Sequence, residues 1–478
     1  MAFEKNNGRD RRPGANRPQP RRDAKRPERP SRNTRTARDA ALSALAEVIS
    51  RGAYASQAID RQLSAGDLSP EDRRLATGIF YAAVENRLKI EFILKPFIKN
   101  APAPVIRDIL HIACAQILFL DRVPDHAAVD EAVKQTRRLK GQELTGFVNV
   151  VLRNVIRARD DGSLAKPDPE DQVGSMSTDY SVSPDLAETL IEAFGVETAR
   201  EICAFRPKDH AQSVRPNLLT SSDGELESWL DSQKIEWKKG IVPHAYRCAH
   251  PGALAETEGY RKGRFSLQGE SSMLAACAVQ AKNGMNVLDA CAAPGGKSAL
   301  LCETMNGTGR VYAWDVYEHR VELIRAAAKR LRLYNLRPSA RDARQPYEPF
   351  ENLMNAVLVD APCSGLGVLA DKPDIRLRFN RKELDELLPL QRDILANCAK
   401  FVKVGGLLVY STCTILPQEN EEQVRAFLRE NPQFAPDNDD SYLPEQFRPL
   451  MKDGMVRFMQ HRDALEGFFI ARMRRKCL

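Results

Sequence analysis

Two cysteines, Cys363 and Cys413, each follow a short and wholly apolar run, residues 357–359 and 407–410. Such runs are typical of buried strands in a parallel sheet. Ligands bind outside the carboxyl ends of parallel strands, so we expect both thiols to face one crevice. A thiolate is a strong nucleophile toward carbon. The pair therefore indicates nucleophilic chemistry, and few reactions need two thiols beside a cofactor site.

A reaction that suits two thiols is methylation of a pyrimidine carbon. Cytosine C5 is a poor nucleophile, but a thiolate that adds to C6 makes C5 reactive, and elimination later releases the methylated base. One cysteine would be the nucleophile and the other would assist release. Asp360, three residues before Cys363, is placed to stabilise the charge that develops near N3 of the ring.

The alternative is that both are buried structural thiols, which is common for free cysteines. Five others lie in apolar helical stretches and fit that description: Cys114, Cys203, Cys277, Cys302 and Cys398. Cys363 and Cys413 differ because both follow strand ends and are flanked by Pro, Ser, Thr or Gly. The chain has no CxxC pair and no Cys/His cluster at zinc spacing. We therefore expect no metal, and reduced thiols of the kind found in the cytoplasm.

A turn of small residues follows an earlier strand-like run and consists of Cys291, Ala292, Ala293, Pro294, Gly295, Gly296 and Lys297. A glycine-rich turn between strand and helix lets the backbone approach a ligand and aims helix N–H groups at it. The turn nearly matches a phosphate-binding loop, but that motif requires glycine at the position of Cys291. It also lacks the G-x-G-x-x-G pattern of dinucleotide sites.

Three more expected strand ends carry a carboxylate: Asp315, Asp342 and Asp360. An acid after the second strand can accept from ribose hydroxyls, and one near the third can accept from an adenine amino group. A cationic, phosphate-free cofactor tolerates these charges, whereas the phosphates of ATP or NAD do not. A single such Asp is usually a loop or helix cap. Three beside a glycine-rich turn favour a site for S-adenosylmethionine.

Strand-like and helix-like segments alternate through residues 266–478, which predicts a doubly wound parallel sheet of the α/β class. The expected strands are residues 286–289, 310–315, 337–342, 355–360 and 406–412. The expected helices are residues 298–305, 318–333, 382–404 and 417–429. Two closing strands, residues 455–460 and 467–473, are expected to run antiparallel.

The whole chain has 478 residues, of which 43% are hydrophobic, and this fits a multidomain globular protein. No apolar run is long enough to cross a membrane, and the hydrophilic N-terminus is not a secretory signal. The net charge of +7 arises in residues 1–35, which contain 12 Lys and Arg and four acidic residues. This segment is expected to be a disordered basic tail, and we favour contact with RNA over a solubilising role.

Residues 36–158 show apolar residues at helical spacing and predict an all-helical domain. It resembles the NusB family of RNA-binding domains through three blocks, residues 72–78, 123–133 and 146–153. That resemblance implies RNA or protein recognition rather than chemistry. Polar residues 159–176 predict a linker, and residues 177–265 a small α/β segment for RNA recognition.

Residues 266–478 resemble the RNA 5-cytosine methyltransferase family, and the helical front domain points to its RsmB (Sun/Fmu) branch. The resemblance rests on the glycine-rich turn, on Pro362 and Cys363, on the Ser-Thr-Cys ending at Cys413, and on residues 372–376 and 417–421. It implies a Rossmann-like domain, S-adenosylmethionine as cofactor and 16S ribosomal RNA as partner. It also implies individual roles: turn 291–297 and Asp315, Asp342 and Asp360 for the cofactor, Cys363 for release and Cys413 as nucleophile.

The chain departs from the family pattern at two places. Gly269 stands where an acid is expected, and Ala464, Leu465 and Glu466 replace a Gly-Thr-Asp. We expect the first to alter substrate-side contacts and the second to alter a hairpin turn, without changing the chemistry.

Two other functions compete with a cytoplasmic, monomeric RNA methyltransferase. A non-catalytic NusB-like RNA adaptor with a degenerate second domain is disfavoured because no site position is missing. In DNA cytosine-5 methyltransferases the nucleophile lies in the Pro-Cys motif of the fourth strand. The Ser-Thr-Cys sequence and the helical domain therefore argue against that class.

Overall fold

The computed structural model of the chain describes residues 35–65, 68–207, 211–249 and 254–477. Of the predicted basic tail, only Arg35 falls within these ranges, so the disorder of the tail and its contact with RNA stay predictions.

The N-terminal domain is all-helical, as predicted. Its helices are α1 (Ala37–Arg51), α2 (Ala55–Ser64), α3 (Pro70–Glu85), α4 (Arg87–Leu94), η1 (Lys95–Phe97), α5 (Pro104–Phe119), α6 (Asp125–Lys140) and α7 (Thr145–Asp160). The sequence starts α3 as expected, because the Ser69 side chain accepts from the Asp72 N–H and Pro70 is the first helical residue. The apolar faces of these helices meet in one core around Phe80 and Ile109.

The next helices, α8 (Gln172–Tyr180), α9 (Pro184–Phe194) and α10 (Val196–Ala204), pack on the C-terminal part of the chain. Leu186 and Leu190 of α9 share a buried cluster with Leu366 and Leu384.

The bounds of the predicted linker, residues 159–176, are wrong at both ends, since α7 runs to Asp160 and α8 begins at Gln172. Polar residues at helix ends, such as the capping Asp171, look like a loop in the sequence alone.

A small antiparallel sheet follows, with the order β2-β3-β1-β4. Its elements are β1 (Gln212–Pro216), α11 (Asp223–Ser232), β2 (Glu236–Lys239), β3 (Tyr246–Ala249), η2 (Leu254–Glu256), α12 (Glu258–Arg261) and β4 (Phe265–Leu267). Arg215 of β1 pairs with Glu303 of the main domain at 2.5 Å, and both side chains are fully buried. The small sheet is thereby fixed to its neighbour.

The main sheet has the order β10-β12-β9-β8-β5-β6-β7, with β11 paired to β12. Its strands are β5 (Asn286–Asp289), β6 (Arg310–Asp315), β7 (Leu336–Ala340), β8 (Met354–Asp360), β9 (Val402–Thr412), β10 (Phe434–Pro436), β11 (Met455–Phe458) and β12 (Phe468–Arg475). The pairs among β5 to β9 are parallel, and those of β10 to β12 are antiparallel. The predicted α/β fold with two closing antiparallel strands is confirmed.

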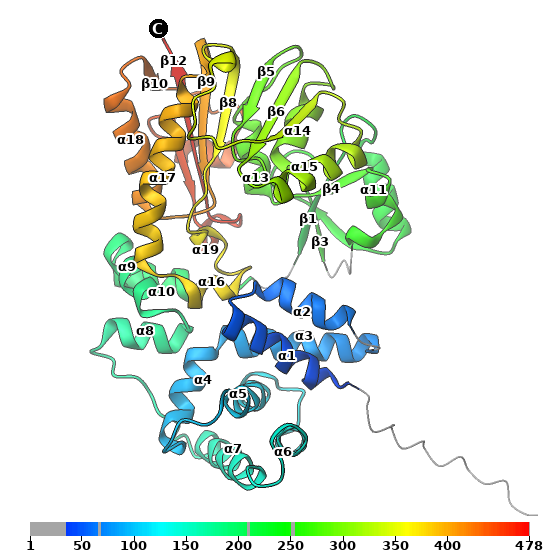
Figure 1. The fold of residues 1–478 in the computed structure, drawn as a ribbon, viewed down its shortest axis with the longest axis vertical. Coiled ribbons are helices and arrows are strands. Elements are labelled where there is room, and N and C mark those ends of the chain that lie inside the picture. The colour runs from blue at the N-terminus through cyan, green and yellow to red at the C-terminus, as the bar shows by residue number, and fades with distance from the viewer. Residues whose placement is uncertain (1–34, 66–67, 208–210, 250–253, 478) are drawn as a thin grey trace, which may run out of the picture.

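Helices cover both faces of this sheet (Figure 1). They are α13 (Glu270–Cys277), α14 (Gly296–Thr304), α15 (Glu318–Leu331), η3 (Glu348–Phe350), η4 (Leu366–Val368), α16 (Pro373–Arg378), α17 (Arg381–Ala399), η5 (Pro417–Glu419), α18 (Glu421–Glu430), η6 (Glu445–Leu450) and α19 (Gln460–Asp463). Alternate residues of β5 point to opposite sides: Val287 joins the core under α13 to α15, and Leu288 joins the core under α17 and α18. This explains the uninterrupted apolar runs in the sequence.

Several strand bounds differ from the prediction. β7 ends at Ala340 rather than at residue 342, so Asp342 follows the strand, and β10 was not predicted. The largest difference is at β9. β9 begins at Val402 rather than at residue 406, and α17 ends at Ala399 rather than at residue 404. The register of β9 on β8 shifts between Met354 and Ala356, and Gly405 has φ 78°. A glycine in this left-handed region lets the strand bulge and continue.

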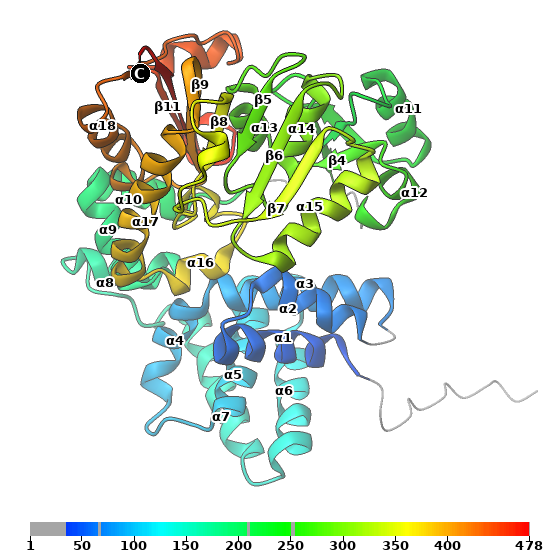
Figure 2. The same cartoon turned by 45° about the horizontal axis from the view of Figure 1, so that its top comes forward.

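The helical domain lies beside the edge of the main domain that carries α16 (Figures 1 and 2). Arg378 of α16 donates to the carbonyl of Gly52, after α1, at 2.9 Å. The two domains are therefore in direct contact.

Candidate active site

The two cysteines lie at the ends of neighbouring strands. In the parallel pair β8 and β9, Asp360 is opposite Ser411. The Sγ atoms of Cys363 and Cys413 are 3.4 Å apart, and both cysteines are free thiols. The structure thus brings the two thiols together at one place, within hydrogen-bond distance.

The surroundings of the two thiols shift their pKa values in opposite directions. The hydrogen bond from Cys363 lowers the pKa of Cys413 despite burial, and the charges of Lys297 and Lys372 lower it further. The same hydrogen bond, together with burial, raises the pKa of Cys363 well above its ordinary value. Cys413 is therefore the more acidic thiol of the pair and the one that more readily forms a thiolate.

Asp360 stands beside the thiols in an ion pair. Its Oδ2 is 2.7 Å from Lys297 Nζ, and its Oδ1 accepts from the Ser411 hydroxyl at 2.8 Å. Burial is the largest single influence on Lys297 and lowers its pKa, but Asp360, Asp289 and Cys413 together outweigh burial and raise it. The pair therefore keeps a proton on the ammonium next to the carboxylate.

The predicted cofactor turn connects β5 to α14. Gly295 has φ 106°, and a Cβ there would lie 3.4 Å from Ile324 of α15. Gly296 begins α14, and a Cβ on it would lie 3.6 Å from the Gln268 side chain. Burial raises the pKa of Cys291, which stays a thiol. The backbone of the turn therefore lies close to the neighbouring residues, which glycine permits because it has no side chain.

The strand-end acids differ in their surroundings. Asp315, at the end of β6, is almost fully buried; its Oδ2 is 3.1 Å from Arg320 Nη1, and its Oδ1 accepts from the Tyr317 N–H at 3.2 Å. Asp342, which follows β7, is held by Arg344 at 2.7 Å, and this contact lowers its pKa. Both are placed at the same edge of the sheet as Asp360.

A further acid, Asp289, was not singled out by the sequence. It ends β5 and is fully buried, and burial raises its pKa to about 7 even though the Ser298 hydroxyl donates to its Oδ2 at 2.6 Å. Its Oδ1 has no hydrogen-bond partner. Its position directly before the glycine-rich turn was the signal that could have identified it.

Two buried residues that support the thiol loops were also missed. Glu419 accepts from the N–H and hydroxyl of Ser364, from Thr414 Oγ1 at 2.9 Å and from Gln391 Nε2 at 2.9 Å. Asn420 accepts from Thr412 at 2.6 Å and donates to the carbonyl of Thr414. Since Ser364 and Thr414 directly follow the two cysteines, Glu419 holds both loops. The match at residues 417–421 was the available signal.

These residues fit S-adenosylmethionine. The edge presents several carboxylates and a buried, unpartnered Asp289 oxygen, which suit hydroxyl and amino donors and a positive charge. The described residues include no group of three or more His, Cys, Asp or Glu arranged to hold a metal ion.

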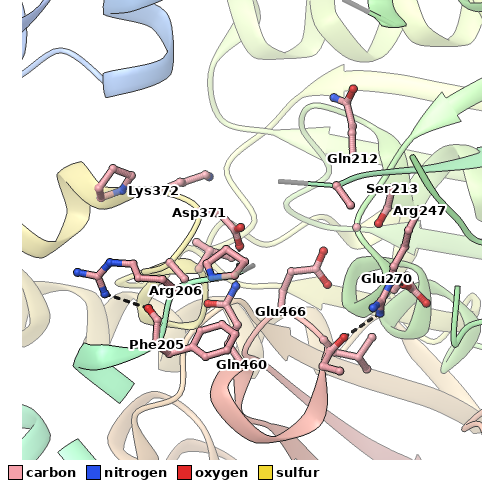
Figure 3. Close-up of a pocket in the computed structure, with 18 of the residues that line it drawn as sticks. Phe205, Arg206, Gln212, Ser213, Arg247, Glu270, Asp371, Lys372, Gln460 and Glu466 are labelled. Atoms are coloured by element: carbon pink, nitrogen blue, oxygen red, sulfur yellow. Dashed lines mark hydrogen bonds and ion pairs between the residues drawn. The ribbon is translucent and has the colours of Figure 1, made fainter. Parts of the chain in front are cut away.

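A large cavity opens between the domains. It has a volume of about 1570 Å³ and lies between α3 of the helical domain, the small sheet and the main domain. Figure 3 shows Lys372 and Arg206 on one side, Ser213 and Arg247 on the other, and Glu466 between them. Lys372, whose charge helps to lower the pKa of Cys413, lines this cavity, whereas neither Cys363 nor Cys413 is among its lining residues.

Known proteins resemble this chain over nearly its whole length. A model of the 16S rRNA methyltransferase RsmB/F family matches residues 276–474, and the NusB family model matches residues 35–157. The probable ribosomal RNA small subunit methyltransferase B of Bacillus subtilis is 37% identical over 441 residues, which are 91% of this chain and 98% of that protein. Its counterpart in Synechocystis is 30% identical over 443 residues, with the same shares of 91% and 98%.

Solved structures of known proteins also resemble this chain. The crystal structure of PH0851 has a TM-score of 0.77 and 26% identity, covering 92% of this chain and 98% of that one. NSun6 from Pyrococcus horikoshii with SFG has a TM-score of 0.55 and 21% identity, covering 62% of this chain and 99% of that one, and shows a shared fold. None of the described helices is long and apolar enough to span a bilayer.

Both domains are matched in the same order as in these relatives. The chain therefore belongs to the RsmB/F family of 16S rRNA methyltransferases, which transfer a methyl group from S-adenosylmethionine to ribosomal RNA.

Proposed function

We propose that the chain methylates cytosine C5 in 16S ribosomal RNA through a covalent bond between Cys413 and C6. The observation that carries the proposal is the thiol pair. The sulfur atoms are 3.4 Å apart, with the pKa of Cys413 lowered and that of Cys363 raised. Methylation of an oxygen or an exocyclic nitrogen needs no thiolate, whereas C5 needs one.

In the proposed reaction, the Cys413 thiolate adds to C6 and the electrons of the C5–C6 double bond move into the ring. The ion pair of Asp360 and Lys297 stabilises the charge that develops near N3. S-adenosylmethionine supplies the methyl group that C5 takes. The C5 proton then leaves to solvent, the C5–C6 double bond re-forms and the bond between C6 and the Cys413 sulfur breaks. Cys363, whose sulfur is 3.4 Å away, assists this release by donating a hydrogen bond to the departing Cys413 thiolate.

For the cofactor we propose the glycine-rich turn, Asp315, Asp342 and Asp360. Asp315 is placed to accept from the ribose hydroxyls and Asp342 from the adenine amino group. Arg344 lowers the pKa of Asp342 and so keeps it a charged acceptor. Lys297 is the cation of the turn and reaches Asp360.

We propose that the RNA strand occupies the large cavity. Cationic side chains enter it from separate parts of the fold: Arg73 and Arg74 of α3, Lys238 of β2, and Lys372. Such charges neutralise phosphates, so the helical domain would form one wall of the substrate site. The monomeric state and the cytoplasmic location stay predictions, and light scattering tests the first.

The test is methyl transfer from labelled cofactor to ribosomal RNA, followed by mapping of 5-methylcytosine. Cys413→Ala is expected to lower the rate below about one-thousandth of wild type. Cys363→Ala is expected to trap a covalent protein–RNA adduct that resists denaturation. The matched control is Cys477→Ala, which removes an exposed thiol.

Normal turnover by Cys413→Ala would overturn the mechanism. An adduct trapped instead in Cys413→Ala would reverse the two roles and favour the order of the DNA enzymes. Absence of cofactor binding in calorimetry would favour the RNA adaptor.

A further inference from the structure

The two places where the sequence is expected to depart from the family pattern meet in space. Gly269 precedes α13, and Glu466 lies in the turn between α19 and β12. A Cβ added to Gly269 would lie 2.2 Å from Glu466 Oε1. The glutamate carboxylate therefore occupies the space that a side chain at position 269 would need.

Glu466 also forms the bonds that a capping side chain would form. Its Oε2 accepts from the N–H of Ser271 at 3.1 Å, and the Ser271 hydroxyl donates to the Glu466 carbonyl at 2.8 Å. Ser271 is in the first turn of α13, whose N–H groups lack partners inside the helix. Gly269 forms no side-chain cap.

The neighbouring acid cannot replace Glu466. Glu270 is turned into the small sheet, where its Oε2 accepts from the N–H groups of Ile241 and Val242 at 2.5 and 2.8 Å. Its other oxygen pairs with Arg247, which donates to the carbonyl of Ala464 at 2.7 Å. The start of α13 thus depends on Glu466.

The same turn reaches the nucleophile. The Gly467 N–H donates to the carbonyl of Gly367 at 2.8 Å, and the Gly367 N–H donates to the carbonyl of Cys413 at 2.9 Å. A Cβ on Gly367 would lie 1.9 Å from the Gly467 carbonyl, so the two backbones touch. Phe468, the next residue, lies under Lys297 Nζ at 5.5 Å.

We propose that Glu466 is a positioning residue, whose carboxylate replaces the acid missing at position 269 and ties α13 to the backbone of Cys413. The two departures then compensate each other: the turn before β12 supplies the acid, and glycine at position 269 leaves room for its side chain. Gln268, before the glycine, lies close to the cofactor turn, 3.6 Å from where a Cβ on Gly296 would be, so a loosened α13 would disturb cofactor and nucleophile together.

The test returns the acidic side chain from position 466 to position 269. Glu466→Ala is expected to lower the single-turnover rate of methyl transfer by roughly ten- to a hundred-fold, with little change in KM for RNA. Gly269→Asp alone is expected to lower it as well, because two carboxylates collide. The double variant Gly269→Asp with Glu466→Ala is expected to recover to within about threefold of wild type, since Asp is a good N-cap.

Glu466→Gln keeps an acceptor oxygen and is expected to retain most of the rate. The matched control is Glu445→Ala, an exposed acid outside this turn. A double variant as slow as Glu466→Ala would overturn the inference, as would a wild-type rate in Glu466→Ala.

The inference rests on the proposed function only for the rate. Hydrogen exchange of the Ser271 amide judges it independently: faster exchange in Glu466→Ala and recovery in the double variant are expected. If the wild-type protein formed no 5-methylcytosine, the proposed function would be wrong. The hydrogen-exchange experiment would still decide the role of Glu466, because it does not measure methylation. Unchanged exchange in Glu466→Ala would contradict the capping role.

Discussion

The core of the helical domain and the strand ends of the catalytic domain treat buried polar groups differently. His111 of α5 is buried beside Arg87, and burial lowers its pKa to about 3, so the ring stays neutral. At the strand ends, burial raises the pKa of Asp289 to about 7, and the Lys297–Asp360 pair stands next to two thiols. In the helical core the buried histidine stays neutral, although the buried Arg87 lies beside it. At the strand ends the pKa of a buried carboxyl lies close to neutral pH, beside an ion pair and two thiols, which suits the proposed chemistry.

The sharpest way to test this contrast is to remove a buried polar anchor in each region. Glu419→Ala removes the carboxylate that accepts from four donors at the thiol loops. Gln391 keeps the Pro362 carbonyl, and the Ser364 and Thr414 hydroxyls keep each other, so the Ser364 N–H and one hydroxyl lose their acceptor. Each unsatisfied buried donor costs about 1–3 kcal/mol. We expect a methyl-transfer rate at least a hundred-fold lower and a lower melting temperature.

The matched change in the helical domain is Gln116→Ala. This buried side chain donates to the Ile112 carbonyl at 2.9 Å and accepts from Arg38 at 2.8 Å. We expect thermal unfolding to occur at lower temperature while the single-turnover rate stays unchanged. Equal effects of both variants on the rate would remove the distinction between the regions.

A second test uses pH, because the two regions should respond with opposite signs. His111 has a folded pKa lowered to about 3, so its contribution to stability is present above its unfolded pKa of about 6.5 and falls as pH drops toward 3. Asp289 has a folded pKa raised to about 7, so its contribution is full below about pH 4 and is lost as pH rises through 7.

Hydrogen exchange resolved along the chain measures this, after correction for the intrinsic exchange rate. Between pH 7 and pH 5 we expect α5 to lose protection and β5 to gain it. His111→Gln should remove the first slope and Asp289→Asn the second. If protection of α5 and β5 changed with pH in the same direction, or if both changes persisted in the two variants, His111 and Asp289 would not be the groups responsible.

The smallest expected effect concerns thiol reactivity. The pKa of Cys413 is lowered chiefly by the hydrogen bond from Cys363, with Lys372 contributing less. Lys372→Ala should therefore slow alkylation of Cys413 several-fold at neutral pH, and Lys372→Arg should preserve it. Cys114 of the helical domain, whose pKa is raised to about 12 by burial, should not react while the protein is folded. A Cys413 that reacts only above pH 9 would show that its thiolate is not stabilised.

Much of the catalytic domain was predictable because its signals are local. The apolar runs of β5 and β6 are bounded by Asp289 and Asp315 as predicted, since a strand buried on both faces has an uninterrupted apolar sequence. Topology then brings Cys363 and Cys413 together, because neighbouring parallel strands end at one edge.

The supporting contacts were not predictable, because their partners are distant in the chain. Glu419 is recognised as an anchor only when Ser364, Gln391 and Thr414 are seen around it. Likewise, Gly269 and Glu466 read as two separate departures until the turn before β12 is placed over α13. Sequence patterns report burial and periodicity, whereas such contacts depend on the closed fold.

The buried pair of Arg215 and Glu303 constrains how this architecture can change by mutation or engineering. Arg215 also donates to Gln268 at 2.7 Å and Glu303 accepts the Leu218 N–H at 3.0 Å, but these two partners are neutral and cannot replace the opposite charge. Losing one partner would leave a buried charge, which is strongly destabilising. The small sheet and helix α14 must therefore be inherited as a unit. A chimera that exchanges the small sheet between relatives should keep β1 and α14 from the same parent.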